Sequence, residues 1–272
     1  MMKVILSLFP GIGLLDRAFE EVFDGETCIV RGPDLLWGGD IRRFHVPPGV
    51  LWGVIGGPPC QMFSALVHLV RANGHEPRFG NLIPEYERVA SEAQPAWFLM
   101  ENVPGAPVPV VDGYVVRDLL LDNRWVGGEQ MRKRRFSFGT RDGRVLAVDY
   151  VALEPPVKYE AVISGNGFGN GADYYRRTGQ AVTAAHSNVP VKVGGSGKLK
   201  RTATTVTSSD GGGKVKMARY SIGEAARLQC LPEDFLADAP FTKEGKLKAI
   251  ANGVPLPMGR AIAKAVKKAM LV

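Results

Sequence analysis

The stretch Val4-Ile5-Leu6-Ser7-Leu8-Phe9-Pro10-Gly11-Ile12-Gly13 decides the fold of this chain. Its first half is an apolar run that predicts a buried strand, and the glycines of its second half predict a tight turn. Residues 14–23 carry apolar side chains at helical spacing, so a helix is expected there. Because strand, glycine turn and helix in this order are typical of a nucleotide-binding α/β domain, we expect a mostly parallel sheet with helices on both faces.

The composition fits a globular chain without a membrane span. With 272 residues and 45% hydrophobic content, the chain can bury a full core as one domain plus a small second lobe. No apolar run reaches the roughly 18 residues of a membrane helix. Cys28, Cys60 and Cys230 lie far apart, which argues against a disulfide scaffold or zinc site and favours a reducing cytoplasm. The four histidines show no ligand spacing, so no metal is expected.

The excess positive charge is concentrated in one segment. The net charge is +7, and residues 141–219 contain 12 Lys and Arg against 6 Asp and Glu. A solvated basic face is one interpretation. The sharper alternative is a lobe that contacts the phosphates of a nucleic acid. Within this segment, Arg176 and Arg177 follow two tyrosines, so stacking and phosphate-binding groups stand side by side.

A second glycine-rich stretch, Gly56-Gly57-Pro58-Pro59-Cys60-Gln61-Met62-Phe63-Ser64, presents a cysteine. It follows the apolar run 51–55, a predicted strand, and its glycines and prolines impose a rigid turn. A cysteine at the start of a helix after this turn would face the positive end of the helix dipole, which favours the nucleophilic thiolate. A small buried cysteine without chemistry is the alternative.

A carboxylate and a basic run follow further along the chain. The predicted strand 97–100 ends in Glu101-Asn102-Val103-Pro104, and an acid at that end of a parallel strand opens onto the ligand crevice. There the acid can hydrogen-bond a nitrogen of a ligand's ring. The alternative is a structural glutamate that forms a salt bridge or caps a helix. Residues 114–123 are expected to form a crossover helix. Gln130-Met131-Arg132-Lys133-Arg134-Arg135 is either a solvated surface run or a source of permanently charged guanidinium groups that stabilise negative charge.

These motifs, in this order, resemble those of the bacterial and phage cytosine-C5 DNA methyltransferases. The resemblance covers Val4 to Met270 apart from residues 145–218. It includes the motifs Pro-Pro-Cys-Gln-x-Phe-Ser, Glu-Asn-Val-Pro and Gln-x-Arg-x-Arg. It implies a Rossmann-like S-adenosylmethionine-dependent methyltransferase fold with a small target-recognition lobe. The expected division is a catalytic and cofactor-binding domain at 1–144, a target-recognition region at 145–218 and a returning segment at 219–272.

The resemblance also implies a role for individual residues. The implied catalytic residues are Cys60, Glu101, Arg132 and Arg134. The residues implied to hold S-adenosylmethionine are Phe9, Gly11, Ile12, Gly13, Asp34, Asp40, Ile41, Pro59, Leu82, Asn252 and Gly253. DNA contacts are assigned to Gln61, Ser64, Gln130, Arg176 and Arg177. Asp34 and Asp40 each have an alternative role as a turn aspartate.

Three positions depart from the family pattern. Ser7 replaces the usual Asp, Leu14 replaces a usual third Gly, and Ala251 replaces a Gly. The first two would weaken or reshape one corner of the cofactor site. Near the C-terminus, Ser221 and Glu224 form a capping box that predicts the start of a helix.

The function expected from the resemblance is transfer of a methyl group from S-adenosylmethionine to C5 of a flipped-out cytosine in duplex DNA. The alternatives are a transfer-RNA cytosine methyltransferase and a catalytically weak DNA-binding homologue. A nicotinamide oxidoreductase would explain only the glycine turn and would leave the motifs of Cys60, Glu101 and Arg134 unexplained. We expect a cytoplasmic monomer in a bacterial cell or phage-infected host. Its expected partner is double-stranded DNA, and a cognate restriction endonuclease is a further candidate partner.

Overall fold

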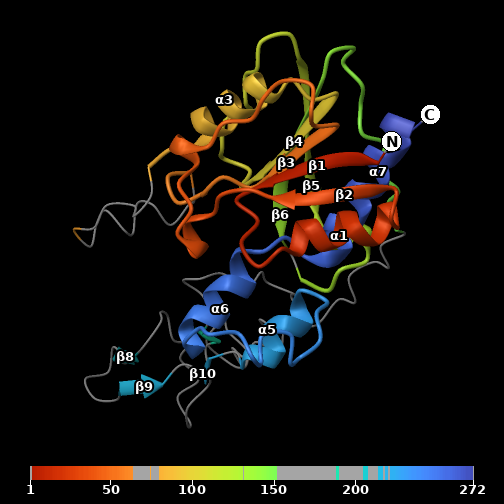
Figure 1. The fold of residues 1–272 in the computed structure, drawn as a ribbon. Helices are drawn as coiled ribbons and strands as arrows, with labels where there is room; N and C mark the ends of the chain where they lie inside the picture. The colour runs from red at the N-terminus through yellow and green to blue at the C-terminus, as the bar shows by residue number, and fades with distance from the viewer. Residues whose placement is uncertain are drawn as a thin grey trace. The chain divides into compact units, whose positions relative to one another are not determined.

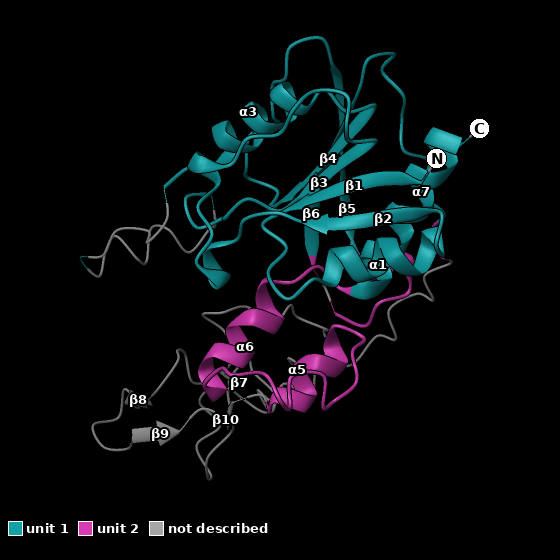
Figure 2. Ribbon diagram, in the orientation of Figure 1, with its two compact units in different colours: residues 1–122, 133–149, 256–272 teal, residues 123–132, 150–255 magenta. Residues whose placement is uncertain are grey.

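The computed structural model in Figure 1 describes residues 2–63, 74, 80–130, 132–151, 188–189, 205–207, 214–216, 218–219 and 221–271. The chain divides into two compact units (Figure 2). Unit 1 comprises residues 1–122, 133–149 and 256–272, and unit 2 comprises residues 123–132 and 150–255. Residues 219–255 therefore group with the basic segment in unit 2, and only the last helix of the chain returns to unit 1.

Unit 1 is built on a six-stranded sheet with the order β2-β1-β3-β4-β6-β5. The four strands β2, β1, β3 and β4 are parallel, and β6 runs antiparallel to both β4 and β5. This arrangement confirms the mostly parallel α/β fold expected from the sequence. The strands are β1 (Lys3–Leu8), β2 (Thr27–Arg31), β3 (Gly53–Gly56), β4 (Trp97–Asn102), β5 (Val115–Asp122) and β6 (Lys133–Thr140).

Three helices of the described residues cover the two faces of this sheet: α1 (Leu14–Phe23), α3 (Ile83–Ala93) and α7 (Leu256–Leu271) (Figure 1). Consecutive residues of a strand point to opposite faces. On β4, Trp97 stacks on Phe19 of α1, whereas Phe98 meets Tyr86 of α3 edge to face. Helices α1 and α3 therefore lie on opposite faces, and α7 packs beside α1. Among the described residues, no helix has both the length and the apolar character needed to cross a membrane.

The prediction of a crossover helix at residues 114–123 is wrong. Those residues form β5, which pairs with β6 along its whole length, from Val115 opposite Thr140 to Asp122 opposite Lys133. Its apolar spacing suits a helix, but the β-branched Val115 and Val116 also favour a strand. The long antiparallel ladder with β6 overrides the local preference, because it satisfies the backbone hydrogen bonds of both strands.

Unit 2 contains the helices α5 (Ile222–Leu228) and α6 (Lys243–Asn252) and a 3-10 turn, η3 (Asn123–Val126). The predicted capping box is confirmed, since Ser221 accepts from the Glu224 amide and the Glu224 side chain accepts from the Ser221 amide. Two short antiparallel pairs complete the described part of this unit. They are β7 (Asn188–Val189) with β10 (Ala218–Arg219), and β8 (Thr205–Thr207) with β9 (Lys214–Lys216).

Candidate active site

The Pro-Pro-Cys loop and the Glu-Asn-Val-Pro segment lie beside each other at the ends of two parallel neighbours, β3 and β4. A Cβ added to Gly57 would lie 3.0 Å from Oε2 of Glu101, so the loop backbone passes directly against this carboxylate. Nδ2 of Asn102 donates to the carbonyl of Pro58 at 3.1 Å. The two motifs are therefore packed against each other and joined by a buried hydrogen bond.

Cys60 follows this hydrogen-bonded loop and is half-buried. Its carbonyl accepts from the Phe63 amide at 3.0 Å, which closes a turn over residues 60–63. Gln61, an expected DNA contact, is exposed on this turn, and Pro59 is half-buried. Ser64, the other expected DNA contact here, and the helix expected after the turn lie outside the described residues.

Glu101 forms an ion pair with Arg134, as its Oε1 lies 2.9 Å from Nε of the guanidinium. The two side chains are only 11% and 16% exposed. The pairing follows from the antiparallel register of β4 and β6, in which Phe136 lies opposite Glu101. Arg134, two residues before Phe136, is then a diagonal neighbour on the same face. Two of the four predicted catalytic residues are thus brought into direct contact.

The glycine turn between β1 and α1 is open enough to take a ligand. Gly11 and Gly13 have positive φ angles of 58° and 76°, which favour glycine at both positions. A Cβ on Gly11 would meet no atom within 4 Å. Gly13 is the N-cap of α1, and no side chain of the described residues caps this helix. Free amide groups at a helix N-terminus beside an open turn fit the polar groups of a nucleotide-type cofactor.

Asp34 holds this glycine turn. One carboxylate oxygen accepts from the Gly11 amide at 2.7 Å, and the other accepts from the Leu36 amide at 2.6 Å. Asp34 is the N-cap of the 3-10 turn η1 (Leu35–Trp37), so its alternative role as a turn aspartate is realised, and its implied contact with S-adenosylmethionine remains a prediction. Trp37, which the sequence analysis missed, donates from Nε1 to the Gly11 carbonyl at 2.9 Å.

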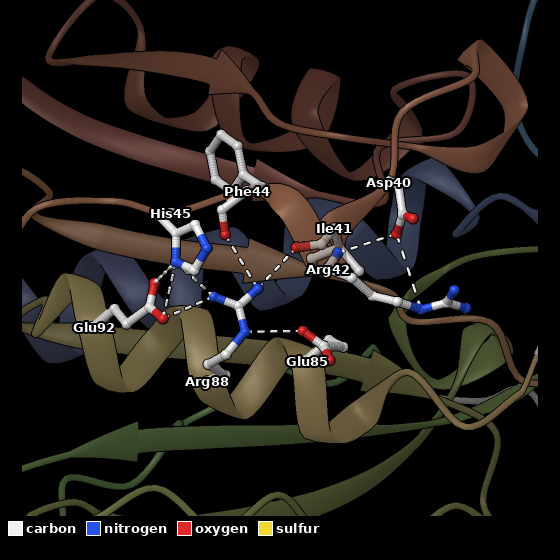
Figure 3. A network of polar contacts seen from close by, with 8 residues as sticks. All are labelled: Asp40, Ile41, Arg42, Phe44, His45, Glu85, Arg88 and Glu92. Atoms are coloured by element: carbon white, nitrogen blue, oxygen red, sulfur yellow. Dashed lines mark hydrogen bonds and ion pairs between the residues drawn. The ribbon is translucent and has the colours of Figure 1, made fainter.

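Asp40 starts a second 3-10 turn, η2 (Ile41–Arg43), and accepts from the Arg42 amide. Figure 3 shows how Arg88 of α3 holds this turn, by donating to the carbonyls of Ile41 and Phe44 at 2.8 and 3.1 Å. The same guanidinium is paired with Glu85 and Glu92 of its own helix. Burial opposes the charged form of Arg88, but the two carboxylates outweigh it and raise its pKa. Arg88 was not among the residues predicted from the sequence.

The apolar residues predicted to contact the cofactor belong to one hydrophobic cluster. Ile41 and Leu82 are buried members of it, and Phe9 is half-buried against it. Phe9 has a positive φ of 56°, which is uncommon for a residue with a side chain. The structure therefore brings Phe9, Ile41 and Leu82 together, although they come from three separate segments.

The remaining predicted residues belong to unit 2 or lie outside the described residues. Gln130 has no exposed surface, and its Nε2 donates to the Leu228 carbonyl and to Oε1 of Gln229. These contacts hold the Gln130 amide nitrogen inside unit 2, and the DNA contact implied for Gln130 stays a prediction. Arg132 is also buried, and its catalytic role stays a prediction. Asn252 is exposed at the end of α6, and Gly253 caps that helix. Arg176 and Arg177 lie outside the described residues.

The sheet order, the helices on both faces and the open glycine turn define a Rossmann-like methyltransferase fold. The methyltransferase EhMeth of Entamoeba histolytica shares this fold, with a TM-score of 0.60 over 98% of both chains at 12% identity.

Sequence relatives narrow this class. The profile of the C-5 cytosine-specific DNA methylase family matches residues 40–107, a range that contains Cys60 and Glu101. The Type II methyltransferase M.HgiDI of Herpetosiphon aurantiacus is 28% identical over 79% of this chain and 72% of its own length. The Type II methyltransferase M.FnuDI of Fusobacterium nucleatum is 27% identical over 98% of this chain and 94% of its own. The chain thus matches the cytosine-C5 DNA methylase family over residues 40–107 and is similar to Type II methyltransferases along most of its length.

Proposed function

We propose that this chain methylates C5 of cytosine in duplex DNA through a covalent bond between Cys60 and C6 of the base. The observation that carries the proposal is the ion pair of Glu101 and Arg134, held directly against the Pro-Pro-Cys loop. When bound, S-adenosylmethionine supplies the methyl group. The glycine turn at Gly11 and the cluster of Phe9, Ile41 and Leu82 would hold it.

The proposed chemistry begins with a cytosine flipped out of the duplex, at a cost of a few kcal/mol. The Cys60 thiolate adds to C6, and the electrons of the C5–C6 double bond move towards C5 and the ring. Glu101 would hydrogen-bond N3 and the exocyclic amine while Arg134 donates to O2, so both groups stabilise the charge that develops on the ring. C5 would then take the methyl group as the sulfur–methyl bond of the donor breaks, which leaves S-adenosylhomocysteine as the product. Removal of the C5 proton by a base allows the Cys60–C6 bond to break, which restores the aromatic ring and the thiolate.

The DNA contacts would come from the basic segment in the second half of the chain. Residues 145–218 carry most of the excess positive charge and include Arg176 and Arg177, so we assign target recognition to this interval. Lys and Arg near the phosphates release counterions, which makes binding dependent on salt. Because M.HgiDI and M.FnuDI are named Type II methyltransferases, we place this chain in a restriction–modification system with a cognate endonuclease as partner. We expect the chain to act as a monomer.

The test is transfer of labelled methyl groups from S-adenosylmethionine to unmethylated duplex DNA and, in parallel, to transfer RNA. We expect label in 5-methylcytosine of the DNA, and its complete loss in Cys60→Ala. Cys28→Ala is the matched control, because Cys28 is another half-buried cysteine of the same unit. Label confined to transfer RNA would refute the DNA substrate. Tight DNA binding without any transfer would indicate an inactive homologue.

A further inference from the structure

The position where the family carries an aspartate, Ser7 at the end of β1, is compensated within this chain. Ser7 is buried, and its hydroxyl donates to Oδ1 of Asp16 at 2.5 Å. Asp16 lies in the first turn of α1 and has no exposed surface. A carboxylate therefore occupies the space beside residue 7, although it comes from the helix and not from the strand.

Arg31 supplies the counter-charge that this buried carboxylate requires. Its Nε donates to Oδ2 of Asp16 at 2.8 Å, and this hydrogen bond to Asp16 is the main cause of the raised pKa of Arg31. Arg31 is also the direct partner of Ser7 in the parallel pairing of β1 and β2. Side chains of paired residues project from the same face of a sheet. An acid at either position 7 or position 16 would thus lie next to this guanidinium.

This group of three residues lies against the glycine turn. A Cβ on Gly13 would be 3.3 Å from Nη2 of Arg31 and 3.6 Å from Oδ2 of Asp16. Gly13 is the N-cap of α1 and has a positive φ, so its backbone passes over the ion pair at close contact. A displacement of the Asp16–Arg31 pair would shift the turn and the first amide groups of the helix.

We propose that Asp16 is a positioning residue for the cofactor corner, and that it takes over from α1 the role of the aspartate that is missing at position 7. Asp16 acts through Ser7, Arg31 and the backbone of Gly13, without touching the cofactor itself. The proposal rests on the proposed function, since it concerns the turn that would hold S-adenosylmethionine.

The test relocates the carboxylate. We compare Asp16→Asn, Ser7→Asp and the double variant Ser7→Asp/Asp16→Ser, and measure the dissociation constant of S-adenosylmethionine by calorimetry. Asp16→Asn should weaken binding about tenfold or more, because the buried carboxylate that holds both Ser7 and Arg31 beside the glycine turn is lost. Ser7→Asp alone should weaken it as well, since two buried carboxylates then share one guanidinium. The double variant should return to within about threefold of wild type, because the acid again lies beside Arg31.

Two further readouts separate positioning from general loss of structure. In methyl-transfer assays, the KM for S-adenosylmethionine should rise while kcat at saturating cofactor stays within about threefold, because Cys60 and Glu101 are not displaced. Glu20→Gln is the matched control. It removes an exposed carboxylate 3.7 Å from the same guanidinium, and it should leave binding unchanged.

Wild-type affinity in Asp16→Asn, or a double variant that binds no better than the weaker single variant, would refute the role of Asp16. Wild-type protein that binds no S-adenosylmethionine would refute the proposed function itself, and the role of Asp16 with it. Circular dichroism of each variant establishes that the chain is folded before binding is compared.

Discussion

Breaking the ion pair of Glu101 and Arg134 should destabilise the protein as well as inactivate it. At 2.9 Å and an effective dielectric constant of about 20, the attraction between the two charges is roughly 6 kcal/mol. Removal of both groups from water offsets most of this gain, so the net contribution is about 1.5–3 kcal/mol, as for other hydrogen bonds between charged groups. Arg134→Met leaves the Glu101 carboxylate 11% exposed without this counter-charge. We therefore expect the free energy of unfolding to fall by about 2–4 kcal/mol.

A double-mutant cycle measures this pair directly. Urea unfolding of wild type, Arg134→Met, Glu101→Gln and the double variant should give a coupling energy of about 1.5–3 kcal/mol. Arg134→Lys is the matched variant, because it keeps the charge and loses the planar guanidinium; it should recover part of the stability but little methyl transfer. A coupling energy indistinguishable from zero would refute the account of the site as a mutually stabilised pair.

Two predictions concern the fold of unit 1. In Gly53→Ala, the new Cβ would lie 2.3 Å from Cζ2 of the buried Trp97, so overpacking should cost about 1–3 kcal/mol or more in urea unfolding. In Gly80→Ala, the new Cβ would have no atom of the described residues within 4 Å, so this variant should be nearly neutral; equal stability of the two variants would contradict the packing. The pKa of Glu21 is lowered from 4.5, chiefly by its hydrogen bond to Arg260, so this interaction stabilises the folded state above about pH 4.5 and is lost as the pH falls through the folded-state pKa. The stability difference between wild type and Arg260→Gln should therefore be largest near neutral pH and shrink in acid; a difference that grows in acid would contradict the assignment.

Short-range patterns in the sequence predicted much of the fold. The helix 14–23 has the bounds expected from its apolar spacing, and the capping box at Ser221 starts α5 as predicted. Both features depend on residues within one or two turns of each other, so the sequence contains all the information that they need. The error at residues 114–123 has the opposite origin, because the partner strand β6 decides between helix and strand there.

The site was predictable as a set of residues but not as an arrangement. Cys60, Glu101 and Arg134 were identified by their motifs, whereas the ion pair between the last two depends on the antiparallel register of β4 and β6. The burial of Gln130 was not predictable either, because a polar residue in a basic run suggests solvent or DNA, whereas its Nε2 donates inside unit 2.

The effect of the serine at position 7, where the family pattern has an aspartate, was likewise not predictable from the motif. On its own, the loss of the usual acid predicted a weakened cofactor corner. The compensating carboxylate of Asp16 lies nine residues away in sequence, and Arg31 lies on the neighbouring strand. Only the packing of β1, β2 and α1 brings the three together.

The central claim, a covalent bond between Cys60 and the target base, can be tested with a duplex in which 5-fluorocytosine replaces cytosine. Fluorine cannot leave C5 as a proton does, so the last step of the proposed chemistry is blocked and the adduct should accumulate in the presence of S-adenosylmethionine. Mass spectrometry of the digested complex should then find the peptide containing Cys60 joined to a methylated fluorocytosine, and Cys60→Ala should give no adduct. An adduct on Cys28 or Cys230, or methyl transfer that proceeds in Cys60→Ala, would contradict the account.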